Sequence, residues 1–395
     1  MQSFNSKCVK EVKPPVTTQS HILPIFPTSS FVFESIEQGM DIFTGKEVGH
    51  VYGRYGNPTI EAVAQKLADL EVYGSDMEAS GIMVSSGMSA ISTLFMSALK
   101  AGDKILSQGN LYGGTTELLQ KIFKNLGIEP IFTDLQDLGQ VEDILKSNPE
   151  IKMLYFETPA NPTLACLDIA ALSQLGKKYN VLTAIDNTFP TPYFQRPLLL
   201  GCDFVIHSTT KFINGHGNSI AGVIIGKDKS FMKDRVWTAM KLAGTNCNPW
   251  DAWLTHNGLK TLTLRMDKHQ ENAQKLAEFL SSNDEIKTVN YLGLEDHSDH
   301  ALAKKQMTGF GGMMSFELKG GLDRGIEFMK KINFCVLAPT LGDTDTLILH
   351  PASMSHKNVA KEMRERNGIT DGLIRISVGI ESAEDIINDI NQALK

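Results

Sequence analysis

The sequence contains few cysteines for its length, and none of them is paired in spacing. Five occur among 395 residues, at Cys8, Cys166, Cys202, Cys247 and Cys335. Such a scatter matches neither a disulfide framework nor a zinc site, so it predicts a reducing compartment, the cytoplasm, and no metal site. The segment 295–300 (EDHSDH) contains metal-ligating residue types, but a solvated turn is the simpler interpretation because they crowd one short polar loop.

Long apolar runs and an excess of basic charge are also absent. No apolar run approaches the length that spans a bilayer, and the N-terminal residues MQSFNSKCVKEVKPP lack the apolar centre of a signal peptide. The formal net charge is −7. The sequence therefore predicts neither a membrane protein nor a nucleic-acid-binding protein.

Residues 56–255 alternate between short apolar runs and longer segments with helical spacing. The expected strands lie at 82–84, 104–106, 130–132, 153–156, 181–185, 204–206 and 222–226. Strands that alternate with helices predict an α/β domain with a mostly parallel sheet covered on both faces. Because ligands bind at the carboxyl ends of parallel strands, we expect residues 56–255 to form a large, ligand-binding domain.

The chain on either side of this domain has a different character. Residues 1–55 are rich in Pro, Ser and Thr without a sustained period, which predicts an extended arm. Residues 256–395 begin with a long expected helix at 259–280. They continue with expected strands at 313–318 and 373–378 and helices near 323–331, 358–366 and 383–394. This order predicts a smaller α+β domain, with the boundary near residue 255.

The stretch 184–226 carries the residues with the clearest chemistry. Asp186 ends the apolar run 181–185, and Lys211 follows the run 204–206 with Ser208 and Thr210 beside it. Ligands bind at the carboxyl ends of parallel strands. A lysine that can form a Schiff base, an acid for a pyridinium nitrogen and hydroxyls for a phosphate are what pyridoxal phosphate requires. A single lysine is more often a surface residue, so the prediction depends on the combination.

The turn Ser85-Ser86-Gly87-Met88-Ser89 lies between an expected strand and an expected helix, where backbone N–H groups can bind a phosphate. A dinucleotide-binding protein would carry a glycine fingerprint after its first strand and an acid about twenty residues later. This turn lacks that pattern. A nucleotide-binding or non-catalytic cofactor-binding α/β protein therefore remains only as the alternative from another class.

Four motifs together resemble the cysteine/methionine-metabolism family of pyridoxal-phosphate enzymes. They are AIDNTF, TPYFQRPLLLGCDFVIHSTTKFINGHG, ETPANPT and VYGRYGNPT, and the resemblance extends from about residue 21 to the C-terminus. It implies the fold-type I architecture, which is aspartate-aminotransferase-like. It also implies a sulfur amino-acid substrate and a homo-oligomer, a tetramer built of catalytic dimers.

The resemblance assigns roles on the cofactor side of the site. Lys211 would form the Schiff base, Asp186 would pair with the ring nitrogen, and Tyr112 would stack on the ring and protonate the leaving group. Residues with an implied phosphate role are Gly87, Met88, Ser208 and Thr210. Residues implied to reach the neighbouring subunit's site are Tyr52 and Arg54.

On the substrate side the resemblance implies three further residues. Asn161 would lie near the phenolic oxygen of the cofactor and the substrate. Arg375 would bind the substrate α-carboxylate, helped by the segment at Thr340.

The reaction within the family stays open at this point. Residues 341–356 (LGDTDTLILHPASMSH) are similar to methionine γ-lyases and acetylhomoserine sulfhydrylases, whereas residues 304–312 (KKQMTGFGG) resemble cystathionine γ-synthases. Pro339 stands where many cystathionine enzymes carry an acid, and Gly114 where methionine γ-lyases usually carry a reactive cysteine. We predict a γ-lyase acting on methionine, homocysteine or cystathionine. The alternative is γ-replacement, by an O-acetylhomoserine sulfhydrylase or a cystathionine γ-synthase.

Overall fold

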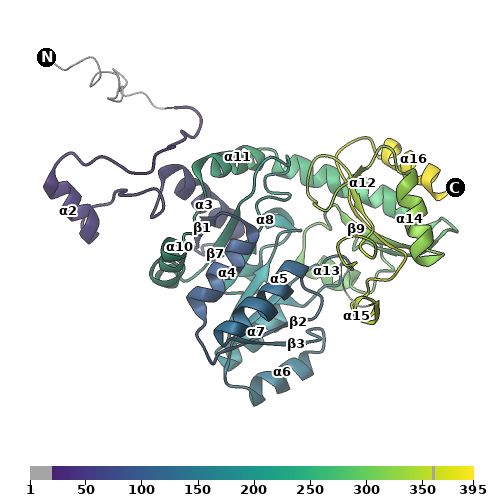
Figure 1. The fold of residues 1–395 in the computed structure, drawn as a ribbon, viewed down its shortest axis with the longest axis horizontal. Coiled ribbons are helices and arrows are strands. Elements are labelled where there is room, and N and C mark those ends of the chain that lie inside the picture. The colour runs from purple at the N-terminus through teal and green to yellow at the C-terminus, as the bar shows by residue number, and fades with distance from the viewer. Residues whose placement is uncertain (1–19, 358–360) are drawn as a thin grey trace.

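The computed structural model describes residues 20–357 and 361–395, and their strands form two sheets (Figure 1). The larger sheet has seven strands in the order β1-β7-β6-β5-β4-β2-β3. They are β1 (Ser80–Val84), β2 (Lys104–Gln108), β3 (Glu129–Thr133), β4 (Ile151–Glu157), β5 (Leu182–Asp186), β6 (Phe204–His207) and β7 (Gly222–Gly226). The smaller sheet has five strands in the order β10-β11-β12-β9-β8.

The strands from β6 to β3 in the larger sheet pair in parallel. Strand β7 runs antiparallel to both β1 and β6. Along the parallel part, Glu157 of β4 pairs with Asp186 of β5, and Asp186 pairs with Ile206 of β6. The α/β prediction is confirmed, and the register brings the ends of β4, β5 and β6 to one edge of the sheet.

Alternate side chains of these strands enter two separate apolar layers, as the two-residue period of a strand requires. Leu154 and Val205 pack into one layer, whereas Met153, Tyr155 and Ile206 pack into the other. Helices cover both faces. The helical elements of this part are α3 (Pro58–Glu71), α4 (Gly87–Ala98), α5 (Gly113–Glu117), η1 (Leu118–Phe123), η2 (Lys124–Leu126), α6 (Leu138–Ser147), α7 (Ile169–Tyr179), α8 (Thr191–Phe194), η3 (Pro197–Leu200), α9 (Lys229–Phe231), η4 (Met232–Val236), α10 (Trp237–Ala243) and α11 (Pro249–Leu259).

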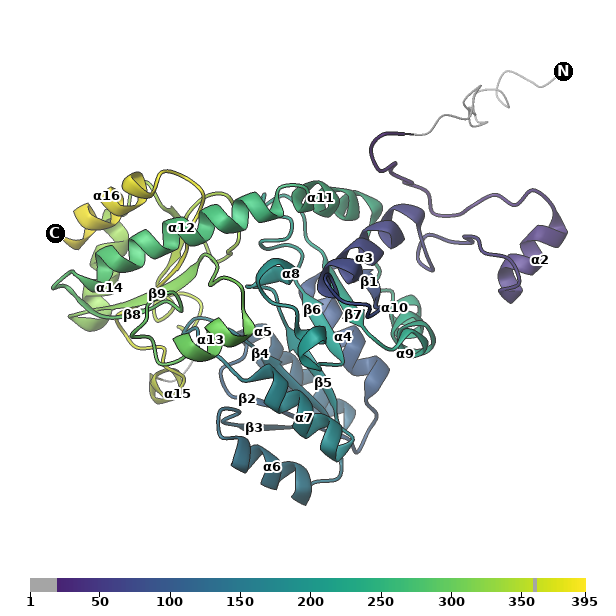
Figure 2. The same ribbon diagram turned by 180° about the vertical axis from the view of Figure 1, so that it is seen from behind.

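The smaller sheet is approached by the long helix α12 (Leu262–Ser281), which extends between the two parts in both views (Figures 1 and 2). α12 packs on β8, β9 and the C-terminal helix, and also contacts α8. The strands are β8 (Ile286–Asn290), β9 (Met313–Leu318), β10 (Val336–Leu337), β11 (Leu347–Leu349) and β12 (Leu373–Ser377). The remaining helices are α13 (His300–Gln306), α14 (Gly321–Lys331), α15 (Lys361–Arg366) and α16 (Ala383–Leu394). Part of the helix expected at 358–366 lies outside the described residues.

The segment that precedes α3 projects away from the two sheets (Figures 1 and 2). Its described part, from residue 20, contains a helix that the sequence analysis did not predict, α2 (Ile36–Thr44). Large apolar side chains of this segment are exposed, among them Val32 at 92% and Val48 at 99%. Within the described residues, no helix combines the length and hydropathy needed to cross a membrane.

Candidate active site

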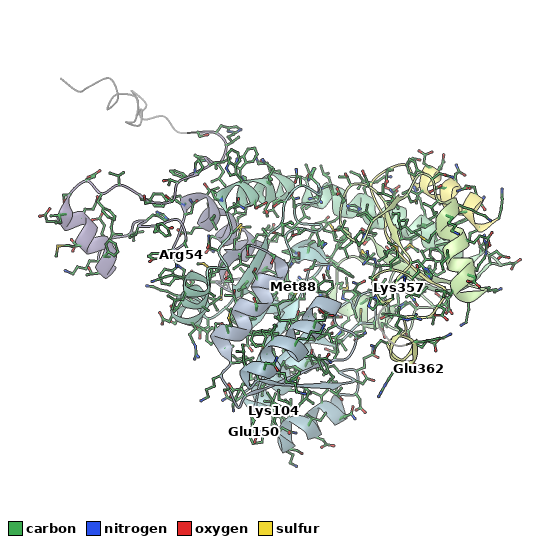
Figure 3. The ribbon with its side chains drawn as sticks, viewed as in Figure 1. Arg54, Met88, Lys104, Glu150, Lys357 and Glu362 are labelled. Carbon is green, nitrogen blue, oxygen red and sulfur yellow. The ribbon has the colours of Figure 1, made fainter. Side chains whose placement is uncertain are left out.

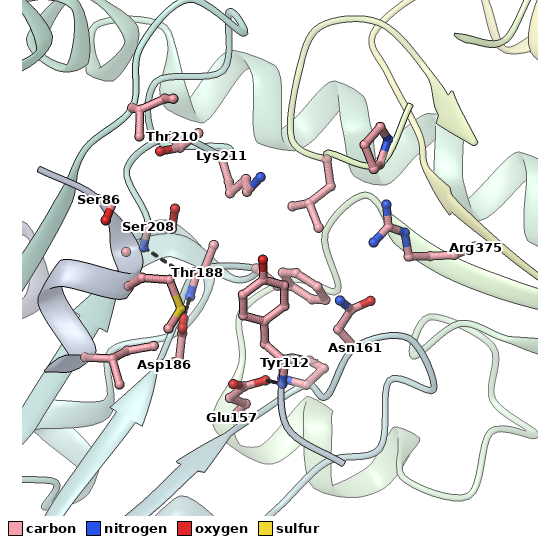
Figure 4. Close-up of a pocket in the computed structure, with 18 residues that line it drawn as sticks. Ser86, Tyr112, Glu157, Asn161, Asp186, Thr188, Ser208, Thr210, Lys211 and Arg375 are labelled. Carbon is pink, nitrogen blue, oxygen red and sulfur yellow. Dashed lines mark hydrogen bonds between the residues drawn. The ribbon is translucent and has the colours of Figure 1, made fainter. Parts of the chain in front are cut away.

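A cavity of about 270 Å³ lies where the ends of β4, β5 and β6 face residues of the smaller sheet (Figure 4). Most of the sequence-predicted site residues meet there. Those that line it are Gly87, Met88, Tyr112, Asn161, Asp186, Ser208, Thr210, Lys211 and Arg375.

Lys211 follows β6 in a turn and is half-buried. Its Nζ donates a hydrogen bond of 2.8 Å to Oγ1 of Thr340. Burial, together with the nearby charge of Arg375, lowers the pKa of Lys211 below that of an ordinary lysine. The amine is therefore more readily available in its neutral, nucleophilic form than a surface lysine would be.

Asp186 ends β5 and faces the cavity. Its Oδ1 accepts a hydrogen bond of 3.0 Å from the backbone N–H of Thr188. Burial raises the pKa of Asp186, while the bonds from Thr188 and the proximity of His207 lower it. Among the described residues no lysine, arginine or histidine side chain lies within ion-pair distance of this carboxyl group. A ligand that carries a positive charge would supply the counterion.

The start of α4 forms the opposite wall. Ser86 caps the helix, because its side chain accepts a hydrogen bond from the N–H of Ser89. The first N–H groups of a helix have no intrahelical partner, so those of α4 can bind an anion. Space here requires glycine: a Cβ on Gly87 would come within 2.7 Å of Cβ of Ser208, and one on Gly222 within 2.3 Å of the Ser86 carbonyl oxygen. Because Ser208 lies this close to the turn, its hydroxyl group is part of the same wall of the cavity.

Arg375 reaches the cavity from β12 and is only 6% exposed. Its Nη2 donates to the Thr340 carbonyl oxygen at 2.8 Å. The Nε of Arg375 and the Oδ1 of Asn161 have no hydrogen-bond partner in the described chain. Burial lowers the pKa of Arg375 to about 10. A buried guanidinium with a free N–H suits a carboxylate ligand, which it can bind through two hydrogen bonds.

The structure adds lining residues that the sequence analysis did not select. They are Ser86, Ile91, Glu157, Pro159, Thr188, Phe189, Ile220, Pro339 and Leu341. Glu157 is the most informative, because its Oε2 accepts a hydrogen bond of 2.8 Å from the backbone N–H of Tyr112. It ends a strand as Asp186 does, and that position was the signal that could have identified it.

Tyr52 and Arg54 do not line this cavity. Arg54 Nη1 donates to the Lys241 carbonyl oxygen at 2.5 Å, and its guanidinium lies 5.5 Å from the ring centre of Tyr52 and 5.0 Å from that of Tyr55. Figure 3 shows Arg54 apart from Met88, near the projecting segment. The role of Tyr52 and Arg54 in a neighbouring subunit stays a prediction.

Comparison with known sequences identifies the family. The sequence model described as "Cys/Met metabolism PLP-dependent enzyme" matches residues 6–395. The chain belongs to this family. The predicted family, fold type and cofactor, pyridoxal phosphate (PLP), are thereby confirmed, and a small-molecule amino-acid substrate follows from membership of this enzyme family.

Relatives with different names cover nearly the whole chain. The chain is 46% identical to L-methionine gamma-lyase of Fusobacterium nucleatum subsp. polymorphum over 374 residues, which cover 94% of this chain and 93% of the relative. It is 40% identical to cystathionine beta-lyase of Lactococcus lactis subsp. cremoris, covering 96% and 95%. The solved structure of cystathionine gamma synthase from Xanthomonas oryzae pv. oryzae in complex with cystathionine superposes with a TM-score of 0.87 at 38% identity, covering 94% and 92%.

The donor set of the cavity itself fits pyridoxal phosphate. A half-buried lysine amine suits the aldehyde, Asp186 without a cation suits a protonated ring nitrogen, and the start of α4 with Ser208 suits the phosphate. The unpartnered N–H of Arg375 is left for a substrate carboxylate.

Proposed function

We propose that the protein is a γ-lyase that converts methionine and water into 2-oxobutanoate, ammonia and methanethiol. The observation that carries this proposal is the composition of the cavity. The amine of Lys211, the phenol of Tyr112 and the guanidinium of Arg375 face one space, whose lining also includes the apolar Pro339 and Leu341 and the amide of Asn161. Relatives named L-methionine gamma-lyase at 39–46% identity support it.

On this proposal the cofactor is held by residues at and after the ends of the strands of the larger sheet. Lys211 binds it covalently, Asp186 pairs with its ring nitrogen, and Tyr112 packs against its ring. Gly87, Met88, Ser208 and Thr210 bind its phosphate. When bound, PLP supplies an electron sink for bonds broken at the substrate.

Three side chains then act on the substrate. Arg375 binds the α-carboxylate, with Asn161 and the segment at Thr340 completing that contact. The Lys211 amine, freed from the cofactor, removes the proton from the α-carbon, gives that proton up to become neutral again, and then removes one from the β-carbon. The hydrogen bond between Lys211 Nζ and Thr340 aims the amine toward the arginine side of the cavity. The Tyr112 phenol donates a proton to the departing sulfur.

Methionine is favoured over cystathionine by the side chains around the γ-position. Pro339 and Leu341 flank Thr340, whose carbonyl oxygen accepts from Arg375, and both line the cavity, whereas the two acids of the lining, Asp186 and Glu157, lie at the strand ends on the cofactor side. An apolar wall accepts an S-methyl group but leaves a distal ammonium and carboxylate without partners.

Two other reactions have specific support. The structural similarity to a cystathionine gamma synthase favours γ-replacement, and the relative named cystathionine beta-lyase favours elimination at the β-carbon. Both would use the same lysine and the same carboxylate-binding arginine. The products distinguish them.

We also propose the assembly and its location. A homotetramer of catalytic dimers would cover the exposed apolar side chains of the projecting segment and bring Tyr52 and Arg54 to a neighbouring site. Residues 1–55 are the arm in this proposal.

The predicted domain boundary at residue 255 falls inside α11. We therefore place the division between the 56–255 and 256–395 domains at the residues between α11 and α12. We assign the enzyme to the cytoplasm.

A substrate panel tests the reaction. Purified holoenzyme is incubated with methionine, cystathionine or O-acetylhomoserine, each with and without sulfide, and 2-oxobutanoate, pyruvate and homocysteine are measured. The proposal expects 2-oxobutanoate from methionine without an added nucleophile. Homocysteine formed only from O-acetylhomoserine plus sulfide would establish replacement instead, and pyruvate from cystathionine would establish a β-lyase.

A further inference from the structure

Glu157 is a titratable side chain of the cavity to which the proposed mechanism gives no task. It is the last residue of β4 and is 6% exposed. Its neighbour in register is Asp186, the last residue of β5. Two carboxyl groups therefore end adjacent parallel strands at the floor of one cavity.

The carboxyl group of Glu157 holds the start of α5. Its Oε2 accepts from the Tyr112 backbone N–H at 2.8 Å, and its Oε1 lies 3.5 Å from Oγ1 of Thr115. No side chain caps α5 at Tyr112. Figure 4 shows the Tyr112 ring rising from this contact toward Lys211 and Arg375. The position of the phenol thus depends on an anchor at the end of β4.

The two carboxyl groups differ in what stabilises a negative charge. Asp186 has the bonds from Thr188 and the proximity of His207. Burial and the proximity of Asp186 raise the pKa of Glu157 well above its usual range, and the contacts with Tyr112 and Thr115 only partly oppose this. The other titratable group facing Glu157 is the Tyr155 phenol, whose pKa burial also raises. Of Glu157, Asp186 and Tyr155, Asp186 is therefore the side chain that carries the negative charge.

We propose that Glu157 is a positioning residue that holds Tyr112 over the cavity as a neutral carboxylic acid. The proposal rests on the proposed function only through the role of the Tyr112 phenol. A neutral acid accepts the Tyr112 N–H through its carbonyl oxygen and donates its O–H toward Thr115. It also leaves Asp186 as the only charged carboxylate beneath the cofactor ring.

Glutamine has the shape and hydrogen-bonding pattern of a protonated glutamate, so the decisive comparison is Glu157→Gln against Glu157→Ala. In the holoenzyme, the glutamine variant is expected to keep kcat within about threefold of the natural enzyme. The alanine variant is expected to lose about tenfold in kcat, because the Tyr112 anchor is missing. A loss of tenfold or more in the glutamine variant would overturn the proposal, since it would mean that the ionised carboxylate is needed.

A double-variant cycle tests whether Glu157 acts through Tyr112. In a Tyr112→Phe background, which lacks the phenol, Glu157→Ala is expected to lower kcat by less than about threefold. A full tenfold loss in that background would show that Glu157 acts on something else and would contradict the proposal. If the alanine variant does not fold, Glu157→Gln in both backgrounds still gives the test, because the proposal expects little change in either.

Matched controls separate the proposal from a general loss of structure. Glu150 precedes β4 at the other end of the strand and is exposed, so Glu150→Ala controls for removing an acid near β4. PLP retention, measured by its absorbance after dialysis, should be equal in the glutamine and natural proteins. If the glutamine variant lost PLP in proportion to any loss of kcat, the proposal would be overturned. These ratios can be measured with whichever substrate is turned over, so an incorrect substrate assignment would leave them interpretable.

Discussion

The two halves of the cavity are built in different ways. The half at the ends of β4, β5 and β6 is dense in polar groups that strand register and the start of α4 fix in place. The half facing it comes from residues 339–341 and β12, and offers one buried arginine beside apolar side chains. The first half carries groups that suit a cofactor shared by many reactions. Side chains in the second half can differ without disturbing those groups, so this half can determine which substrate binds.

The halves also carry opposite charges, and among the described residues neither Asp186 nor Arg375 has an ion-pair partner. Burial raises the pKa of Asp186 on one side and lowers that of Arg375 to about 10 on the other. Each pKa shift means that burial destabilises the charged form of the side chain as long as no oppositely charged ligand is bound. A positively charged ring nitrogen would relieve the first, and a substrate carboxylate the second. The cavity is thus electrostatically prepared for two ligands that bind at different ends.

Removing Lys211 should have the largest effect, because it serves both halves. Lys211→Ala is expected to lower turnover by at least about a thousandfold, since it removes the proposed base and the attachment of the cofactor. Product formation and the absorbance of bound PLP would be measured together. Lys227→Ala, which removes a lysine near the opposite ends of the strands, is the control. Turnover within tenfold of the natural enzyme in Lys211→Ala would refute the role.

Removing Arg375 should damage only the substrate half. Arg375→Ala is expected to lower kcat/KM by about a hundredfold, mainly through KM, because charged hydrogen bonds to the carboxylate are lost. PLP content should be unchanged. Since Arg375 helps to lower the pKa of Lys211, its removal should raise that pKa, and uptake of PLP by the apoprotein should shift to higher pH. A shift to lower pH, or an unchanged KM, would contradict this division.

Introducing an acid at position 339 should change specificity without changing chemistry. Pro339→Glu is expected to raise the kcat/KM ratio of cystathionine to methionine by up to about tenfold, because a carboxylate there could pair with the distal ammonium. Pro339→Gln, of similar size and uncharged, is the matched control. An equal change in both variants would mean that shape, rather than charge, controls the choice.

The smallest effect tests how the halves are joined. Gly342 has φ +81°, and a Cβ there would come within 2.5 Å of the Phe212 nitrogen and 3.1 Å of the Lys211 Cα; Gly74 has a similar φ of +87° with nothing within 4 Å. Both Gly→Ala variants should lose about 1 kcal/mol of unfolding free energy from the left-handed backbone, and Gly342→Ala should lose more because its Cβ would clash with the backbone of residues 211–212. Only Gly342→Ala should also slow turnover by severalfold. Equal activity in the two variants would show that this contact does not position the lysine.

Much of the cofactor half could be predicted from sequence because its residues follow apolar strands directly. Asp186 and Lys211 are of this kind, and the structure brings them to one cavity. Glu157 follows the same rule, but the sequence analysis contains it only as the first residue of the ETPANPT motif and predicts no role for it. The proton distribution between Glu157 and Asp186 depends on strand order, which puts β4 beside β5. A single sequence does not specify that neighbourhood.

The substrate half and the projecting segment were harder to predict for different physical reasons. Arg375 lies in a strand, and the strand pattern alone does not specify whether its side chain points outward or inward; tertiary packing buries it. Helix α2 did carry a local signal. Ser35 accepts from the Gln38 N–H, the Gln38 side chain accepts from the Glu34 N–H, and Gly45 adopts φ 74° after the last turn. The surrounding prolines and polar residues obscured that pattern.

The most direct test of the central claim is the product balance from methionine alone. Holoenzyme is incubated with methionine in the absence of any thiol, and 2-oxobutanoate, ammonia and methanethiol are quantified over time, with Lys211→Ala as the blank. The account predicts the three products in equal amounts and none from the blank. Intact methionine after prolonged incubation, with an enzyme that forms homocysteine from O-acetylhomoserine and sulfide, would contradict it.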